Sequence, residues 1–254
     1  MIGADPFHVL GVPITWLGVG IFAGGLVGAR WLARALPRYG IEPSYAWRLF
    51  PWAILGGCAG AKLWAATETL FTPGRATFRD VVLGPSGATF YGGLALGAAA
   101  VVVRAWFDGK PLWAVSNAIA PSLAIGQAIG RLGCFLLGDD YGVPTSLPWG
   151  MAFPRGAPPT AERVHPAQLY EAAWLLACAL FLRQRMPHSR LLIAEYLVLQ
   201  GAGRFAIEFV RTNPATVGVF STSQVIALFC LAAGLVGLAA AQSLESLVKG
   251  GEET

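Results

Sequence analysis

Long apolar runs alternate along this chain with short segments that hold most of its charge. Four runs contain no Asp, Glu, Lys or Arg, and each approaches or exceeds the roughly 20 residues that a helix needs to cross a bilayer. They cover residues 10–29, 81–103, 111–130 and 212–244. Three weaker apolar segments, with ionisable residues inside or beside them, cover 47–70, 165–182 and 191–210. The pattern predicts an all-α, polytopic membrane protein with about seven transmembrane helices.

The longest polar connection covers residues 138–164, between the fourth and fifth predicted helices. Five prolines limit its helix content. Loops of this length are often binding loops or lids, so we expect a loop region on the outer side of the membrane. No linker or soluble block divides the chain and no convincing internal repeat is visible, so residues 1–254 are expected to form a single integral membrane domain.

Small residues recur at four-residue spacing inside the predicted helices. This spacing lets helix backbones approach closely where lipid supplies no hydrophobic drive. Close helix packing is therefore expected at four glycine pairs: Gly24/Gly28, Gly56/Gly60, Gly93/Gly97 and Gly126/Gly130.

Composition supports the membrane assignment, because 55% of the residues are hydrophobic and only 13% are charged, against about 25% charged in an average soluble domain. The net charge is +4. Most positive charges fall in alternate connections, which the positive-inside rule assigns to the cytoplasm. The N-terminus is then outside, the C-terminus cytoplasmic and the first run a retained helix rather than a signal peptide. The cytoplasmic basic residues are Arg30, Arg34, Arg38, Arg48, Arg104, Lys110, Arg183, Arg185, Arg190 and Lys249.

This charge pattern suits anionic lipid surfaces and gives no indication of nucleic-acid binding. The four cysteines are Cys58, Cys134, Cys178 and Cys230. They lie in or beside separate predicted helices without CxxC spacing, so neither a metal site, a cofactor nor a disulfide framework is expected. Small packing residues are their simplest role.

Several ionisable residues lie within or at the edge of the apolar segments, where charges need partners. Arg131 directly follows the uncharged apolar run 111–130, within the stretch 126–135, and Arg204 and Glu208 stand four residues apart. One interpretation is structural ion pairing inside the helix bundle. The other is that Arg131 and Arg204 reach the same outer level and bind a phosphate, to which guanidinium groups donate in pairs.

Arg211 follows Glu208 by three residues, so one helix face can carry an Arg-Glu-Arg ladder. Glu171 can neutralise either Arg131 or Arg204, and the sequence does not decide between them. Lys62 is a further ionisable residue of this kind in the second apolar segment.

Four polar side chains also gather at the start of the fifth segment, in the order His165, Gln168, Tyr170 and Glu171, and Pro166 follows the histidine. Proline suits the first turn of a helix. A lone histidine at a helix start is more often a hydrogen-bonded structural residue than a catalyst.

Two neighbouring positions allow both a structural and a functional interpretation. Asp139 and Asp140 lie between glycines, where aspartate commonly shapes a turn, but both are close in sequence to Arg131. Tyr91 precedes two glycines at the start of the third segment and suits either the membrane interface or a polar cavity.

Together these motifs resemble the prolipoprotein diacylglyceryl transferase family over nearly the whole chain. The resemblance implies an enzyme of the bacterial inner membrane, with no cofactor, that moves the diacylglyceryl group of phosphatidylglycerol to the cysteine thiol of a prolipoprotein and releases glycerol phosphate. The matching stretches, in family order, are 60–63, 90–94, 120–121 with 130–133, 165–171 and 203–211.

The resemblance also implies roles for particular residues. Arg131 and Arg204 match essential arginines, Asp139 stands where the family usually has glutamate, and Glu208 and Arg211 match its carboxylate and following arginine. We expect the catalytic residues to be Arg131, Arg204, Tyr91, Asp139 and His165. The expected substrate-binding residues are Lys62, Cys134, Gln168, Tyr170, Glu171, Gln200, Glu208 and Arg211.

Three positions depart from the family pattern. Tyr91 replaces a histidine, Cys134 an asparagine and Gln200 a tyrosine. A phenol with an ordinary pKa near 10 is a poorer base at pH 7 than an imidazole near 6.5. The anion-binding half of the site is therefore expected to be retained and the half that activates the acceptor to be altered.

Three hypotheses follow from these observations. The leading one is a diacylglyceryl transferase, acting on a prolipoprotein cysteine or, in a divergent branch, on another lipid or acceptor. The second is a membrane protein that binds phospholipid without chemistry. The third is a solute transporter, which the lack of an internal repeat disfavours.

Overall fold

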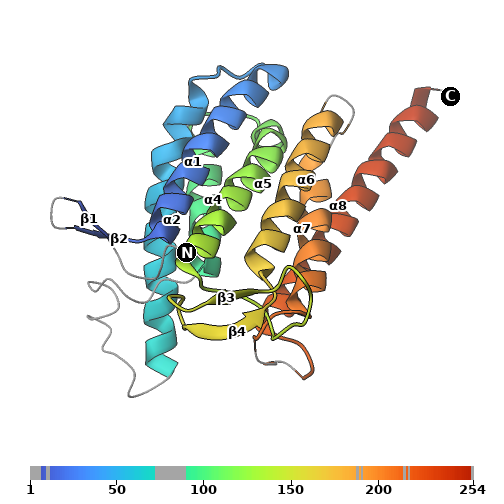
Figure 1. Ribbon diagram of the computed structural model, residues 1–254. Helices are drawn as coiled ribbons and strands as arrows, with labels where there is room; N and C mark the ends of the chain where they lie inside the picture. The colour runs from blue at the N-terminus through green and yellow to red at the C-terminus, as the bar shows by residue number, and fades with distance from the viewer. Residues whose placement is uncertain are drawn as a thin grey trace. The chain divides into compact units, whose positions relative to one another are not determined.

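The computed structural model describes residues 7–9, 12–71, 90–186, 189, 191–213, 216 and 218–252. Each of the seven predicted segments corresponds to one α-helix of the described chain (Figure 1). A short 3-10 helix, η1 (Leu36–Tyr39), continues the first of them. The helices are α1 (Trp16–Ala35), α2 (Tyr45–Phe71), α4 (Phe90–Phe107), α5 (Leu112–Leu137), α6 (Ala167–Arg185), α7 (Leu192–Glu208) and α8 (Thr222–Glu252).

Four helical segments among the described residues are long and apolar enough to cross a membrane. They are Trp16–Tyr39, Tyr45–Thr67, Leu112–Leu137 and Thr222–Ser243, and the apolar part of α4, Gly92–Phe107, is shorter. The length and apolar composition of these helices are consistent with a protein that crosses a membrane several times. The finer expectation that all seven helices cross stays a prediction.

The helices α1 and α8 begin well inside the apolar runs that predicted them, and residues 81–89 of the third run lie outside the described residues. The first run starts at residue 10, but β1 (Phe7–Val9) and β2 (Val12–Ile14) form an antiparallel hairpin there. Thr15 then caps α1, because its Oγ1 accepts the N–H of Gly18 at 3.2 Å. Apolarity alone therefore placed the start of this helix too early.

The start of α8 lies ten residues inside the last apolar run. Ser221 Oγ accepts the N–H of Gln224 at 3.2 Å, and Gln224 Oε1 accepts the N–H of Ser221 at 3.0 Å. This reciprocal pair is a capping box, which fixes the first turn of the helix.

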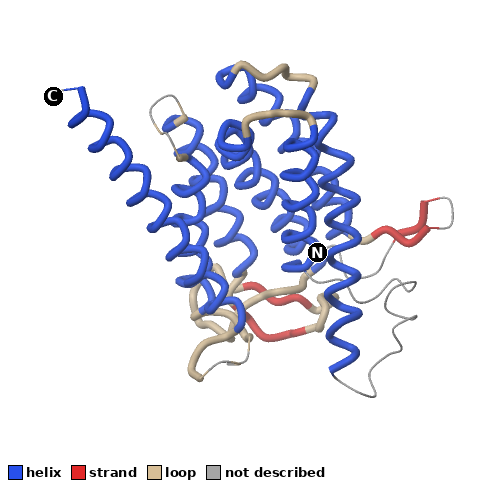
Figure 2. Tube along the Cα trace, turned by 180° about the vertical axis from the view of Figure 1, so that it is seen from behind, coloured by secondary structure: helices blue, strands red, loops and turns tan. Residues whose placement is uncertain are grey.

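The chain forms two compact units. The first contains Met1–Trp31 and Ser116–Thr254, and the second contains Leu32–Val115. In the first unit α7 packs against both α6 and α8, and in the second α2 packs against α4. Figure 2, seen from behind, shows the described helices in blue and the short strands in red.

Glycines let paired helices approach closely within each unit, as the four-residue spacing predicted. In the first unit, a Cβ on Gly24 of α1 would overlap the backbone of Gly126 in α5. In the second, a Cβ on Gly60 of α2 would overlap the backbone of Gly92 in α4. Gly130 is different, because nothing lies within 4 Å of the position a Cβ would take.

The long connection after α5 contains no helix, as its prolines predicted, but it contains a second hairpin. β3 (Met151–Phe153) pairs antiparallel with β4 (Thr160–Val164). The protein is therefore mostly helical with two small hairpins, rather than strictly all-α.

Backbone hydrogen bonds tie this connection to two helix ends. Gly142 donates to the carbonyl of His165 at 2.8 Å, just before α6, and Val143 donates to the carbonyl of Val210 at 2.9 Å, just after α7. Residues from α5, the connection, α6 and the end of α7 are thereby held together in the first unit.

Candidate functional site

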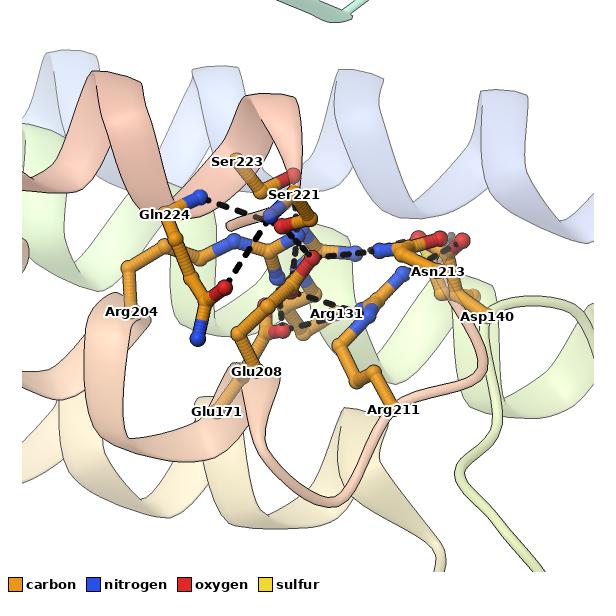
Figure 3. A network of polar contacts seen from close by, with 11 residues as sticks. Arg131, Asp140, Glu171, Arg204, Glu208, Arg211, Asn213, Ser221, Ser223 and Gln224 are labelled. Atoms are coloured by element: carbon orange, nitrogen blue, oxygen red, sulfur yellow. Dashed lines mark hydrogen bonds and ion pairs between the residues drawn. The ribbon is translucent and has the colours of Figure 1, made fainter. Parts of the chain in front are cut away.

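Three arginines contact one buried carboxylate, Glu171 of α6 (Figure 3). Arg131 of α5 places its Nε 2.5 Å from Glu171 Oε2, and Arg211 places its Nη1 3.0 Å from Glu171 Oε1. Arg204 of α7 also forms an ion pair with Glu171 Oε1. The sequence left open whether Glu171 neutralises Arg131 or Arg204, and the structure shows that it contacts both.

Glu208, at the end of α7, joins two of the same arginines. Its Oε2 lies 3.0 Å from Arg204 Nη2 and 3.5 Å from Arg211 Nε. The predicted Arg-Glu-Arg ladder is confirmed.

Asp140, in the loop after α5, supplies a third carboxylate. Its Oδ2 accepts from Arg131 Nη1 at 2.8 Å, and its Oδ1 lies 2.7 Å from Arg211 Nη2. From the sequence, both a structural and a functional role were open for Asp140, and it was not among the expected site residues. These six residues, which we call the arginine–carboxylate network, are Arg131, Arg204, Arg211, Asp140, Glu171 and Glu208.

Polar side chains from α8 and the connection before it complete the surroundings of the network. Ser221 Oγ donates to Glu208 Oε1 at 2.6 Å, and Asn213 Nδ2 donates to the same oxygen at 2.8 Å. Arg204 Nη2 donates to Ser223 Oγ at 3.0 Å. These residues were not predicted from the sequence, although Ser221 and Gln224 have the Ser-x-x-Gln spacing of a capping box, which is a signal of a helix start.

The network is largely buried and its charges balance. Three guanidinium groups face three carboxylates, so no net charge is left in a poorly solvated place. The side chains of Glu171 and Glu208 are 6% and 2% exposed, whereas that of Asp140 is 42% exposed. Solvent therefore reaches the network at Asp140.

Asp139 and Cys134 lie beside Arg131. The Sγ of Cys134 is 3.8 Å from Arg131 Nη1, and Asp139 donates its N–H to the carbonyl of Cys134 at 3.3 Å. Gln168 of α6 donates through its Nε2 to the main-chain oxygen of Asp139. Three expected site residues, Cys134, Asp139 and Gln168, are thus brought together next to Arg131.

The two neighbouring aspartates have opposite electrostatic environments. Burial, followed by the negative charge of Asp140, raises the pKa of Asp139 to about 6. Burial also acts to raise the pKa of Asp140, but the guanidinium groups of Arg211 and Arg131 outweigh it and hold that pKa below its ordinary value. At neutral pH Asp140 is a fixed anion, while Asp139 can exchange a proton.

His165 and Tyr170 form a separate pair. The Nδ1 of His165 is 3.2 Å from the hydroxyl of Tyr170, which also accepts a hydrogen bond from Trp149 Nε1 at 2.8 Å. Among the described residues, the His165 side chain therefore contacts Tyr170 and not the arginines.

The three remaining expected site residues lie on α7, α2 and α4. Gln200 lies on α7, one turn before Arg204 and partly exposed. Lys62 lies on α2, in the second unit. Tyr91 lies on α4 of the same unit, and its side chain is outside the described residues.

The donors of this site suit an anion. No group of three or more His, Cys, Asp or Glu side chains suited to a metal ion occurs among the residues that the structure describes. Clustered guanidinium groups are instead the preferred protein partners of phosphate and carboxylate groups. Fold and site define a helical protein with apolar helices suited to a membrane and a largely buried cluster of three arginines and three carboxylates.

The chain belongs to the prolipoprotein diacylglyceryl transferase family. The model of that family, described as prolipoprotein diacylglyceryl transferase, matches residues 6–240. A protein of Synechococcus elongatus named phosphatidylglycerol–prolipoprotein diacylglyceryl transferase is 31% identical over 238 residues, which is 89% of this chain and 82% of that protein. A protein of the same name from Nostoc sp. is 30% identical over 241 residues, 90% of this chain and 85% of its own length. The resemblance drawn from the motifs is confirmed.

Proposed function

We propose that this protein transfers the diacylglyceryl group of phosphatidylglycerol to the cysteine thiol of a prolipoprotein. Membership of a transferase family supports the reaction type. The observation that carries the proposal for the site is the convergence of Arg131, Arg204 and Arg211 on Glu171. These arginines come from two helices and a helix end, and such a cluster suits a phosphodiester headgroup.

In the proposed reaction the thiolate sulfur attacks the glycerol carbon that carries the phosphate. A carbon–sulfur bond forms, the carbon–oxygen bond breaks, and its electron pair stays with the departing glycerol phosphate. Negative charge grows on that phosphate, so guanidinium groups already held in place stabilise the transition state. Arg131 and Arg204 have this role in the proposal.

The thiol must also lose its proton, and Asp139 is the best-supported acceptor. A general base is most effective when its pKa lies near the working pH, and the pKa of Asp139 is raised to about 6. Its position beside Cys134 and Arg131 supports this role. His165 and Tyr91 are the other proton-handling residues of the proposal, with His165 oriented by Tyr170.

The remaining expected residues bind the substrate or position the reactive groups, and they take no part in bond making or proton transfer. Glu171 and Glu208 hold Arg131 and Arg204 in position, and Arg211 adds a third guanidinium group to the proposed phosphate site. Cys134 contacts Arg131, and Gln168 contacts the main chain of Asp139. Tyr170, Gln200 and Lys62 complete the proposed substrate-binding set.

We also propose that all seven helices cross the bacterial inner membrane as one domain, with the N-terminus outside and the C-terminus in the cytoplasm. The basic residues of the alternate connections support this orientation. The arginine–carboxylate network then lies at the outer side, where an exported prolipoprotein is accessible.

The test of the function is complementation in cells depleted of their own transferase. Mass spectrometry of a model lipoprotein should show the added mass of a diacylglyceryl group when this chain is expressed. Arg131→Ala and Arg204→Ala should each lower the modified fraction by at least about 100-fold. Arg185→Ala is the matched control, because Arg185 forms an exposed ion pair with Glu195 at 3.0 Å outside the network.

A second function, phospholipid binding without chemistry, is favoured by Tyr91 in place of the family's histidine. A folded protein that binds phosphatidylglycerol but adds no mass to the lipoprotein would support this function and reject the transferase proposal for this acceptor.

A further inference from the structure

Asp140 occupies the place in the network where a phosphate would be expected. Its two carboxylate oxygens each contact a different guanidinium group, that of Arg131 at 2.8 Å and that of Arg211 at 2.7 Å (Figure 3). The two non-bridging oxygens of a phosphodiester can make the same pair of contacts. A lipid phosphate bound to these two arginines would compete with the Asp140 carboxylate for one position.

Of the three carboxylates in the network, that of Asp140 is the one that a ligand can displace. Glu171 contacts three arginines and is 6% exposed, and Glu208 contacts two arginines, Ser221 and Asn213 and is 2% exposed. The side chain of Asp140 is 42% exposed, so its charge can return to water when it is displaced. Removing either glutamate would strand a charge in a buried place.

Charge balance also favours a phosphate that replaces the Asp140 carboxylate over a phosphate that binds in addition to it. The network holds three guanidinium groups and three carboxylates, so an added phosphate monoanion would leave it with one negative charge in excess. Replacing the Asp140 carboxylate by a phosphodiester, which carries a single charge, keeps the network neutral. A ligand with one negative charge is the class that fits.

The backbone around Asp140 is held while its side chain is exposed. The carbonyl of Asp139 accepts from Gln168, and Gly142 donates to the carbonyl of His165 at 2.8 Å. Asp140 itself has a φ of 60°, the only positive φ of a non-glycine residue in the described chain. This conformation is uncommon for residues with a side chain, although aspartate tolerates it better than most. Exchange can therefore occur by side-chain rotation, without movement of the loop.

We propose that Asp140 is an internal occupant of the phosphate subsite, which a singly charged phosphodiester headgroup must displace in order to bind Arg131 and Arg211. Asp140 then sets both the affinity for the lipid and its charge selectivity. The inference rests on the proposed function, because it takes the network as the headgroup site.

The experiment compares the full-length protein with Asp140→Asn, titrated in detergent with phosphatidylglycerol and followed by native mass spectrometry. The amide removes the competing charge, so binding should become about tenfold tighter, equivalent to about 1.4 kcal/mol. Diacylglycerol, which lacks the phosphate, should bind both proteins equally. Glu162→Gln is the matched control, because Glu162 is an exposed carboxylate on β4 outside the network.

Unchanged or weaker binding of phosphatidylglycerol by folded Asp140→Asn would overturn the proposal. If Asp140→Asn fails to fold, Asp140→Gly replaces it, because glycine accepts the positive φ, and the same tightening is expected. Failure of both variants to fold would identify Asp140 as a structural counter-ion and reject the inference. If neither the unsubstituted protein nor the variant binds phosphatidylglycerol, the proposed function itself fails, which is a distinct result.

Discussion

At the scale of single residues, the two neighbouring aspartates have different roles. Asp140 faces Arg131 and Arg211 and stays ionised, while Asp139 faces Cys134 and has its pKa raised to about 6. Adjacent residues in one turn point to different partners, so one carboxyl is an electrostatic partner and the other can transfer a proton.

The raised pKa of Asp139 predicts opposite effects on stability and on activity. Because the folded protein binds this proton more tightly than the unfolded chain, ionisation costs stability, and the cost appears as the pH rises from about 4 to about 6. Asp139→Asn should therefore raise the unfolding temperature at pH 7 and leave it nearly unchanged at pH 4. Thermal unfolding of the purified protein at both pH values measures this. A lower unfolding temperature at pH 7 would show that the carboxylate is stabilising instead.

Activity should respond to Asp139 in the other direction. If the ionised carboxylate accepts the thiol proton, activity should fall about tenfold per pH unit below about pH 6. Asp139→Asn should lose about 100-fold or more of the activity and abolish this acid limb. A pH profile of lipoprotein modification in membranes tests the assignment, and retention of the acid limb in the variant would assign the base elsewhere.

Glu171 is the residue on which the network depends most, since three arginines contact it. Glu171→Gln would leave three buried guanidinium groups with two carboxylates, and unpaired buried charge typically costs about 3–5 kcal/mol. We expect a large drop in the unfolding temperature and loss of activity. Glu162→Gln, at an exposed position, should change neither. A stable Glu171→Gln protein would show that solvent or lipid compensates the arginines.

At the scale of helices, close backbone contacts and end caps decide the packing. Gly24 of α1 lies against the backbone of Gly126 in α5, and α8 starts at a capping box that also reaches Glu208. Helix pairing and the site are therefore linked through a few small residues.

The α1–α5 contact predicts different effects for two glycine substitutions. Gly24→Ala would force its Cβ into the backbone of Gly126, and the two helices would have to separate. We expect a loss of about 1–3 kcal/mol, as in other overpacked positions. Gly130→Ala meets nothing within 4 Å and should be neutral or stabilising by up to about 1 kcal/mol, because alanine favours helix. Unfolding temperatures in detergent should separate the two variants, and equal losses would argue against the close approach.

The capping box of α8 predicts a combined effect for Ser221. Ser221→Ala removes the cap on the Gln224 N–H and the hydrogen bond to Glu208. The cap alone is worth about 1 kcal/mol, and the buried hydrogen bond to a charged group about 1.5–3 kcal/mol more. Ser243→Ala, far along the same helix where the exposed Ser243 donates to the carbonyl of Ala239, is the control and should have little effect on thermal unfolding.

At the scale of the whole molecule, all six residues of the arginine–carboxylate network belong to one of the two compact units, the one formed by Met1–Trp31 and Ser116–Thr254. Ligand binding to this network should therefore stabilise that unit by mass action.

Phosphatidylglycerol should raise the unfolding temperature of the purified protein in proportion to the logarithm of its concentration. At 100 times the dissociation constant the gain is about 2.7 kcal/mol. Phosphatidylcholine, which has a phosphate but no net charge, should stabilise less, and Arg131→Ala should reduce the response to phosphatidylglycerol. Equal responses to both lipids would mean that the acyl chains, not the headgroup, provide the binding energy.

The sequence determined the helices and the family by itself. An apolar run long enough to cross a bilayer predicts a helix without information from the rest of the chain. The family could be recognised because the motifs around Arg131, His165 and Arg204 are each local in sequence. Helix boundaries were predicted less well, since hydropathy does not show that Thr15 and Ser221 cap the helices at those points.

Only the tertiary structure decided which charges meet. Arg131, Glu171 and Arg211 are separated by about 40 residues from one to the next, and nothing local specifies that they share one network. The sequence also did not show which of Asp139 and Asp140 contacts the arginines. Asp140 has a positive φ and its carboxylate lies against the arginines, whereas Asp139 lies beside Cys134. Apolar periodicity is encoded residue by residue, whereas ion pairing depends on which helix ends the folded chain brings together.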